Sequence, residues 1–97
     1  MFEVHVFVGR AESAGIDATG YAQGERHAVL LYLRQEQGTD YSAEAAKCWL
    51  EQRSWVNAVF TRAAVARETQ QTDFAEAYRK ALEVGGAAII YSTPLES

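Results

Sequence analysis

The stretch that decides the predicted fold runs from Arg34 to Glu51 and reads RQEQGTDYSAEAAKCWLE. A related stretch, RETQQTDFAEAYRKALE, runs from Arg67 to Glu83. At an offset of 33 residues the two align through a shared Thr-Asp-aromatic sequence, and treating Ser42 as an insertion aligns the remainder. Amphipathic helices rich in Ala, Glu, Lys and Leu resemble one another by composition alone. This match, however, begins in the loop before each helix, where helix propensity does not constrain the choice of residues. We therefore interpret the two stretches as copies of one unit.

Each copy predicts a helix whose ends are marked by particular residues. In the first copy Ser42 is the expected N-cap, because serine oxygens accept hydrogen bonds from free helical N–H groups. In the second copy Asp73 is the expected N-cap, and Glu76 three residues later completes a capping box. Gly85-Gly86 is expected to end the second helix, since glycine tolerates the left-handed conformation found there. The expected buried residues of the first helix are Ala46, Trp49 and Leu50.

Four segments have the patterns of strands. Residues 2–8 alternate apolar and other side chains, as in a half-buried strand. Residues 27–34, HAVLLYLR, are apolar almost throughout, and residues 87–91, AAIIY, form a short buried strand. Residues 55–67 are long for one strand and have two interpretations: a hairpin turning near Phe60, or a single long or bulged strand. The absence of Gly, Pro, Asn or Asp at that turn favours the single strand.

The predicted order is β-β-α-β-α-β, an α+β fold with a duplicated strand–helix unit. Right-handed crossovers should make the strands that flank each helix parallel. The expected sheet is therefore four-stranded and mixed, with two helices packed mainly on one face. We expect a single domain, with an N-terminal strand and long loop in 1–26, a first repeat in 27–60 and a second repeat in 61–97.

At the level of fold this organisation resembles ferredoxin-like domains and the dimeric α+β barrels, although no motif assigns the chain to a named family. That resemblance implies a homodimer. It leaves the activity open, because such folds serve as ligand sensors, cofactor-free enzymes and oligomerisation modules.

Composition and charge exclude several classes of protein. The 97 residues include 13 acids and 9 bases, and a net charge of −4 argues against nucleic-acid binding. The N-terminal sequence MFEVHVFVGR lacks the features of a signal peptide, and no apolar run approaches the roughly 20 residues of a membrane helix. The single cysteine, Cys48, excludes an internal disulfide and a multi-cysteine zinc site. We therefore expect a cytoplasmic protein without membrane contact, metal or cofactor.

The segment 10–26, RAESAGIDATGYAQGER, has the composition of a functional loop. It holds three of the seven glycines, and Arg10, Tyr21 and Arg26 lie among them. Two arginines at the base of the loop can face an anionic ligand, since a guanidinium binds carboxylate or phosphate through two parallel hydrogen bonds. The alternative is a solvated hairpin loop with charged ends. The glycine spacing does not fit a dinucleotide-binding fingerprint.

The two histidines are weaker candidates for functional residues than the residues of the 10–26 segment. With His27 expected opposite Gly9, His5 lies about four residues away, or roughly 13 Å, which is too far for one shared metal. His5 alone can act as a general base or as a pH-sensitive contact with a ligand or partner. The alternative is an ordinary strand histidine. Cys48 lies in mid-helix and is expected to be a small, buried or half-buried side chain.

Two classes of function remain after these exclusions. The leading hypothesis is a small acidic binding domain that forms a homodimer through an exposed sheet edge and binds a basic protein or a small anionic ligand. The alternative is a small cofactor-free enzyme or ligand-binding protein of the dimeric α+β barrel type, whose polar groups come from His5, Tyr32, Arg10 or Arg62. The enzyme requires a pocket in which one of these side chains meets another titratable group.

Overall fold

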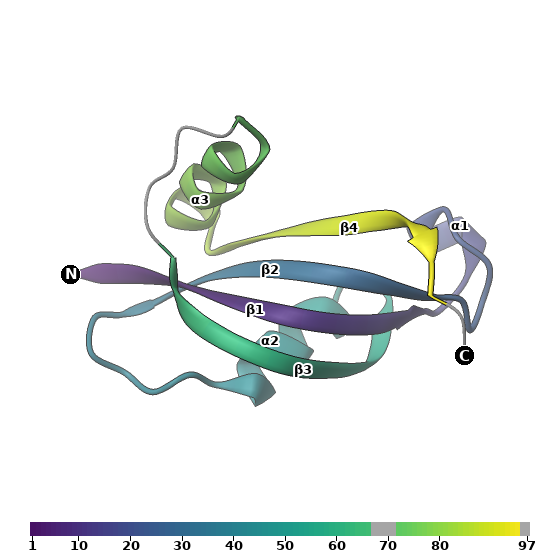
Figure 1. Ribbon diagram of the computed structural model, residues 1–97, viewed down its shortest axis with the longest axis horizontal. Helices are drawn as coiled ribbons and strands as arrows, with labels where there is room; N and C mark the ends of the chain where they lie inside the picture. The colour runs from purple at the N-terminus through teal and green to yellow at the C-terminus, as the bar shows by residue number, and fades with distance from the viewer. Residues whose placement is uncertain (67–71, 96–97) are drawn as a thin grey trace.

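A computed structural model describes residues 1–66 and 72–95 of the chain. The elements are β1 (Phe2–Ser13), α1 (Ile16–Thr19), β2 (Arg26–Glu36), α2 (Ala43–Glu51), β3 (Trp55–Ala66), α3 (Thr72–Val84) and β4 (Gly86–Pro94). Figure 1 shows the strands side by side in one antiparallel sheet, in the order β3-β1-β2-β4. The α+β class and the four-stranded sheet are confirmed, with α1 as an additional short helix.

The sheet is not mixed, as the sequence predicted, and the ferredoxin-like strand order is not confirmed. β2 and β3, which flank α2, do run in the same direction, because both are antiparallel to β1. β3 and β4, which flank α3, run in opposite directions, because β4 is antiparallel to β2, so the expected parallel arrangement is wrong there. β2 and β3 are not neighbours, however, since β1 lies between them. The crossover through α2 passes over β1 and adds β3 at the outer edge, so every adjacent pair is antiparallel.

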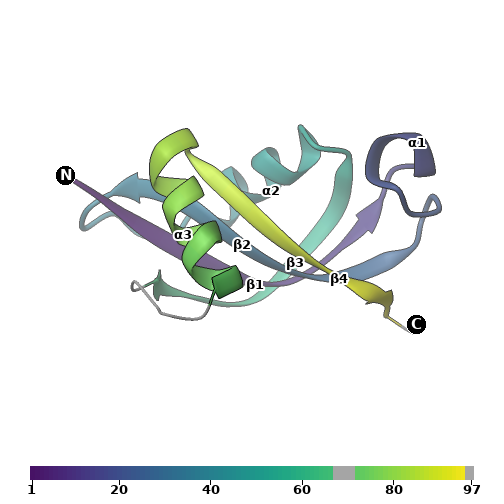
Figure 2. The ribbon, with the colours of Figure 1, turned by 90° about the horizontal axis from the view of Figure 1, so that it is seen from above.

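The two long helices pack on opposite faces of the sheet, which corrects the expectation of one shared face (Figure 2). On the face that we call the α2 face, Leu50 of α2 belongs to a core cluster with Phe7 of β1. On the opposite face, the α3 face, Ala81 of α3 clusters with Val4 of β1. The two strand–helix units therefore occupy unequal places in the fold, and the duplication is not confirmed as a structural repeat.

The two faces differ in how completely they are covered. On the α2 face the side chains of β1 and β2 that are less than a tenth exposed are His5, Phe7, Ala11, Ser13, His27, Val29, Leu31 and Leu33. On the α3 face Val4 and Tyr32 are buried at the end that carries α3. Further along the same face Val8 is 37% exposed and Val59 44%. About half of the α3 face therefore has no helix over it.

β1 and β3 are both long strands. β1 continues through Arg10 to Ser13, so His27 pairs with Ala11 and not with Gly9 as expected. β3 is one strand with irregular pairing to β1, which confirms the single bulged strand and rules out the hairpin. One irregularity lies next to Gly9, where a Cβ atom would collide with the carbonyl oxygen of Val59.

The predicted helix ends are confirmed where the structure describes them. Ser42 caps α2, its Oγ accepting a hydrogen bond of 3.1 Å from the N–H of Ala45. Gly85 follows α3 with a φ of 102°, and its N–H donates to the Ala81 carbonyl at 2.9 Å. The side chain of Asp73, the expected cap of α3, lies outside the described residues. None of the described helices has the length and apolar character needed to cross a membrane.

Candidate functional site

A groove follows the free side of β4, which forms one edge of the sheet. Its volume is about 600 Å³, and residues 86–90 of β4 form its floor. Side chains of α2 and the start of β3 line one wall, and side chains of α3 line the other. The groove therefore opens onto both faces of the edge strand at once.

The first wall is an aromatic surface with a cation on it. A Cβ atom on Gly86 would lie only 2.7 Å from Cε2 of Trp49, so the absence of a side chain there allows the indole to pack against the strand. The guanidinium carbon of Arg53 lies 3.6 Å from the Trp49 ring centroid, a cation–π contact. Arg53 Nη1 also donates to the Trp49 carbonyl at 3.1 Å. These two contacts hold the guanidinium along the rim.

The second wall carries both signs of charge. Glu76 and Lys80 lie one helical turn apart on α3, and both line the groove together with Val84. The floor begins with the small residues Gly86, Ala87 and Ala88. A groove with this narrow apolar floor, lying beside unpaired strand backbone, is suited to an extended chain.

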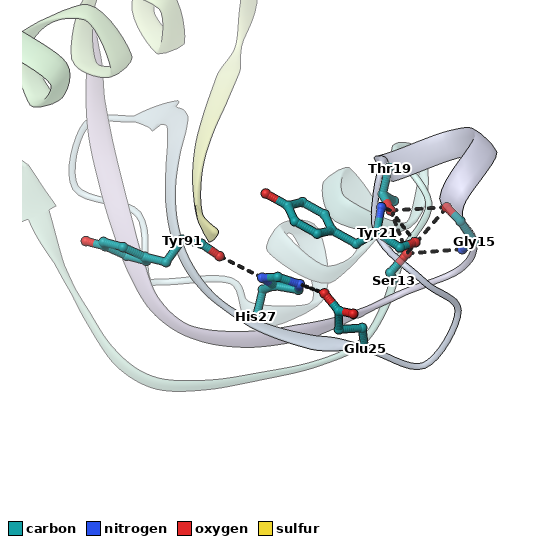
Figure 3. A network of polar contacts seen from close by, with 7 residues as sticks. All are labelled: Ser13, Gly15, Thr19, Tyr21, Glu25, His27 and Tyr91. Carbon is teal, nitrogen blue, oxygen red and sulfur yellow. Dashed lines mark hydrogen bonds and ion pairs between the residues drawn. The ribbon is translucent and has the colours of Figure 1, made fainter. Parts of the chain in front are cut away.

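A buried histidine fixes the far end of β4 (Figure 3). His27 is fully buried, and its Nδ1 lies 2.7 Å from the carbonyl oxygen of Tyr91. Because a carbonyl oxygen only accepts, Nδ1 carries a proton and donates it. The other ring nitrogen, Nε2, lies 2.6 Å from Oε1 of Glu25. His27 thus links β4 to the carboxylate of Glu25, the residue that precedes β2.

The loop between β1 and β2 packs around this histidine. The ring of Tyr21 lies with its centroid 4.0 Å from that of His27, and both rings contact Trp55. Ser13 Oγ holds the loop by donating to the Tyr21 carbonyl at 2.8 Å and accepting from the Gly15 N–H at 3.1 Å. Tyr21, a predicted binding residue, is therefore a half-buried packing residue in this structure.

His5 forms a similar pair at the opposite end of the α2 face. Its Nε2 lies 2.7 Å from Oε2 of Glu3, and its ring meets Tyr41 edge-on with centroids 4.8 Å apart. The side chain is fully buried, and its Nδ1 has no hydrogen-bond partner among the described residues. A ligand therefore cannot reach this imidazole without a rearrangement of the residues around it. The hydrogen bond from His5, helped by the N–H of Gly38, lowers the pKa of Glu3 below its ordinary value of 4.5.

This lowered pKa predicts how acid destabilises the protein. The native state holds the Glu3 carboxylate more strongly than the unfolded chain does. Its contribution is therefore complete above pH 4.5 and is lost as the pH falls through the native pKa. We expect Glu3→Gln to make the loss of unfolding free energy below pH 4.5 shallower, as measured by urea titrations at several pH values. Glu51→Gln, at an exposed helix position, should leave the slope unchanged; equal slopes for wild type and Glu3→Gln would contradict the prediction.

The four predicted site residues are not brought together. Tyr21 and His5 belong to the α2 face, at opposite ends of it. Arg10 and Arg26 directly precede Ala11 and His27, which point to the α2 face. Because successive side chains of a strand point to opposite faces, both arginines lie on the α3 face. Arg10 pairs with Ala28, so Arg26 is its diagonal neighbour. The two arginines therefore remain a pair, separated from Tyr21 and His5 by the sheet.

The side chains proposed for an enzyme do not converge on the groove. None of His5, Tyr32, Arg10 and Arg62 lines it. Burial, with a smaller Coulombic effect of Tyr91, raises the pKa of Tyr32 above its ordinary value of 10, which opposes its use as a base. Within the described ranges no group of three His, Cys, Asp or Glu side chains is placed to hold a metal ion.

Cys48 is exposed, which corrects the expectation of a buried or half-buried side chain. The buried side of α2 consists of Ala46 and Leu50, with Trp49 half-buried beside them. Cys48 lies outside this stripe, near the amide nitrogen of Gln52 at 3.8 Å. The helix therefore uses fewer of its positions for the core than the sequence pattern suggested.

The sequence did not reveal the groove. Its one signal was the run of small residues Gly86, Ala87 and Ala88, which leaves space at the beginning of a strand. Trp49 was expected to be a core residue, and no pattern marked Arg53 or Lys80. Only the folded chain places all three along one groove. The pairing of β4 with β2 makes the run of small residues the floor of a groove.

No protein-family model, curated protein or solved structure matches this chain. The proposed function therefore rests on the geometry of the described residues.

Proposed function

We propose that this protein is a small, acidic, cytoplasmic binding domain that forms a homodimer by pairing β4 with β4 of a second copy. The observation that carries this proposal is the groove along β4. One side of the strand is hydrogen-bonded to β2, and the other has no strand partner in the described part of the chain. Strand edges of this kind pair readily with another chain.

Both walls of the groove have a role in such pairing. A strand added beside β4 forms main-chain hydrogen bonds with it, and its side chains point alternately to the two faces of the sheet. On one face they meet Trp49 and Arg53, and on the other they meet Glu76 and Lys80. Backbone pairing supplies affinity, while the walls select the side chains.

A second copy fits this groove better than a basic protein does. The rim carries two cations, Arg53 and Lys80, against one acid, Glu76, so it does not attract a basic partner despite the net charge of −4. Antiparallel pairing of β4 with itself is symmetric, and it places the Ile89 and Ile90 region of each copy against the other. It continues the sheet from four strands to eight.

Sedimentation equilibrium tests this proposal. We expect a dimer of 10.7 kDa protomers for the wild type. Ala88→Lys, in the floor of the groove, should give a monomer, because its ammonium reaches water in the single copy but would be buried in the pair. We expect dimer affinity to fall about 100-fold or more, the cost of burying an unpaired charge.

A matched variant on the other edge strand completes the experiment. Val59 of β3 is 44% exposed, so Val59→Lys adds the same charge to the edge that the proposal does not use. This variant should dimerise as the wild type does. Dissociation by Val59→Lys and not by Ala88→Lys would place the interface on β3, and a monomeric wild type at high concentration would exclude the homodimer.

A further inference from the structure

Three arginines lie on the part of the α3 face that α3 leaves open. They are Arg26 of β2, Arg10 of β1 and Arg62 of β3. The register sets Ala28 opposite Arg10 and Val8 opposite Arg62, so each arginine is a diagonal neighbour of the next. Diagonal neighbours in a sheet are about 7–8 Å apart. The three side chains, which we call the arginine row, therefore cross three strands in a line.

The arginine row has an excess of positive charge. Within residues 1–66 and 72–95 none of its guanidinium groups forms an ion pair with a carboxylate. Glu12 is the acid nearest in register, directly opposite Arg26. The chain as a whole has a net charge of −4, so this patch is opposite in sign to the rest of the molecule. Three like charges at this spacing repel one another until an anion binds between them.

Exposed apolar side chains accompany these charges. Val59 lies opposite Arg10 and is 44% exposed, while Val8 lies opposite Arg62 and is 37% exposed. Arginine beside exposed apolar groups is the composition of protein-binding surfaces. The patch thus combines charge recognition with apolar area that a partner can cover.

We propose that the arginine row binds an extended acidic segment of a partner protein, with carboxylates at alternate positions. Alternate residues of an extended chain are about 6.8 Å apart, close to the spacing of the row. Each guanidinium can bind one carboxylate through two hydrogen bonds, and the backbone of the extended segment lies over Val8 and Val59. A second copy docked face to face would set arginines against arginines, so a second copy is not the partner of this surface. The arginine row lies on β1, β2 and β3, and it is therefore separate from the proposed interface at the edge of β4.

Fluorescence anisotropy with labelled peptides tests this proposal. The probe is the alternating peptide Glu-Val-Glu-Val-Glu-Val, and the control is Glu-Glu-Glu-Val-Val-Val, which has equal charge and composition. We expect the alternating peptide to bind several-fold more tightly, with an affinity that falls as salt is added. Arg10→Gln and Arg62→Gln should each weaken binding by about 3- to 10-fold. Lys47→Gln, at an exposed position of α2, should have no effect.

Three outcomes would overturn the proposal. Equal affinity for the two peptides would show general charge attraction without recognition of spacing. Absence of binding to either peptide would remove the site. Tighter binding of a single-stranded oligothymidine, lost in the same arginine variants, would assign the row to nucleic acid. Sedimentation of Arg10→Gln separates this proposal from the homodimer, because the variant should remain dimeric.

Discussion

Gly9→Ala is expected to lower the free energy of unfolding by about 3 kcal/mol or more. A Cβ atom at this position would collide with the carbonyl oxygen of Val59 and lie 2.8 Å from Cα of Phe60. Both are backbone atoms of β3, so no side-chain rotation relieves the contact. β1 and β3 must separate where their register shifts, and the strand pairing on both sides weakens. Because small domains have only about 5–15 kcal/mol of stability, the loss is a large fraction of the total.

Urea denaturation at one fixed protein concentration measures this effect. Gly20→Ala is the matched control: Gly20 has a φ of 86°, but a Cβ atom there would meet nothing within 4 Å. It should cost only about 1 kcal/mol, the strain of alanine in the left-handed region. If Gly9→Ala lowered the free energy of unfolding no more than Gly20→Ala does, β3 would not approach β1 as closely at Gly9 as the structure shows.

Local features of this fold could be predicted from the sequence. Ser42 and Gly85 mark helix ends through their own conformational preferences, and both were assigned correctly. The alternation in residues 2–8 identified the side chains that share a face of β1. In each case the information lies within a few residues of chain. Neighbouring residues are sufficient for such predictions because the interactions concerned are themselves local.

The arrangement of the elements could not be predicted in this way. Alternation in β1 shows two sets of side chains, but both sets are apolar near Val4 and Phe7, so it does not show which helix covers which set. The similarity of the two helices suggested equivalent places, although each needs only a narrow apolar stripe that fits either face. The groove could not be predicted for the same reason, because it depends on the contact between Trp49 and Gly86, two residues that are far apart in the sequence.

His27→Phe is expected to lower the free energy of unfolding by about 3 kcal/mol. The substitution keeps a ring of similar shape against Tyr21 and Trp55 but removes both nitrogens. The carbonyl of Tyr91 and the carboxylate of Glu25 then lose a buried partner each. Leaving a buried group of this kind unpaired costs about 1–3 kcal/mol, and the carboxylate of Glu25, which is 29% exposed, recovers part of its loss from water.

The loss of hydrogen-exchange protection should be local to one end of β4, which distinguishes the expected effect of His27→Phe from a general loss of stability. The pairing of β2 with β4 is irregular between His27 and Val29, so the His27–Tyr91 bond holds β4 where regular pairing is interrupted. Hydrogen exchange should therefore show protection lost in residues 91–93 before residues 86–90. The dimer should weaken as well, because the second half of the paired strand is no longer held in place.

His5→Phe is the matched control for the same chemistry. His5 is equally buried, but only one of its nitrogens has a partner, and Glu3 retains the hydrogen bond from Gly38. It should cost about 1 kcal/mol and leave β4 protected. Equal losses for the two variants, or unchanged exchange in residues 91–93, would show that His27 fills space without anchoring the strand. In that case the hydrogen bond from His27 to the Tyr91 carbonyl would not be what holds this end of β4 in place for pairing with a second copy.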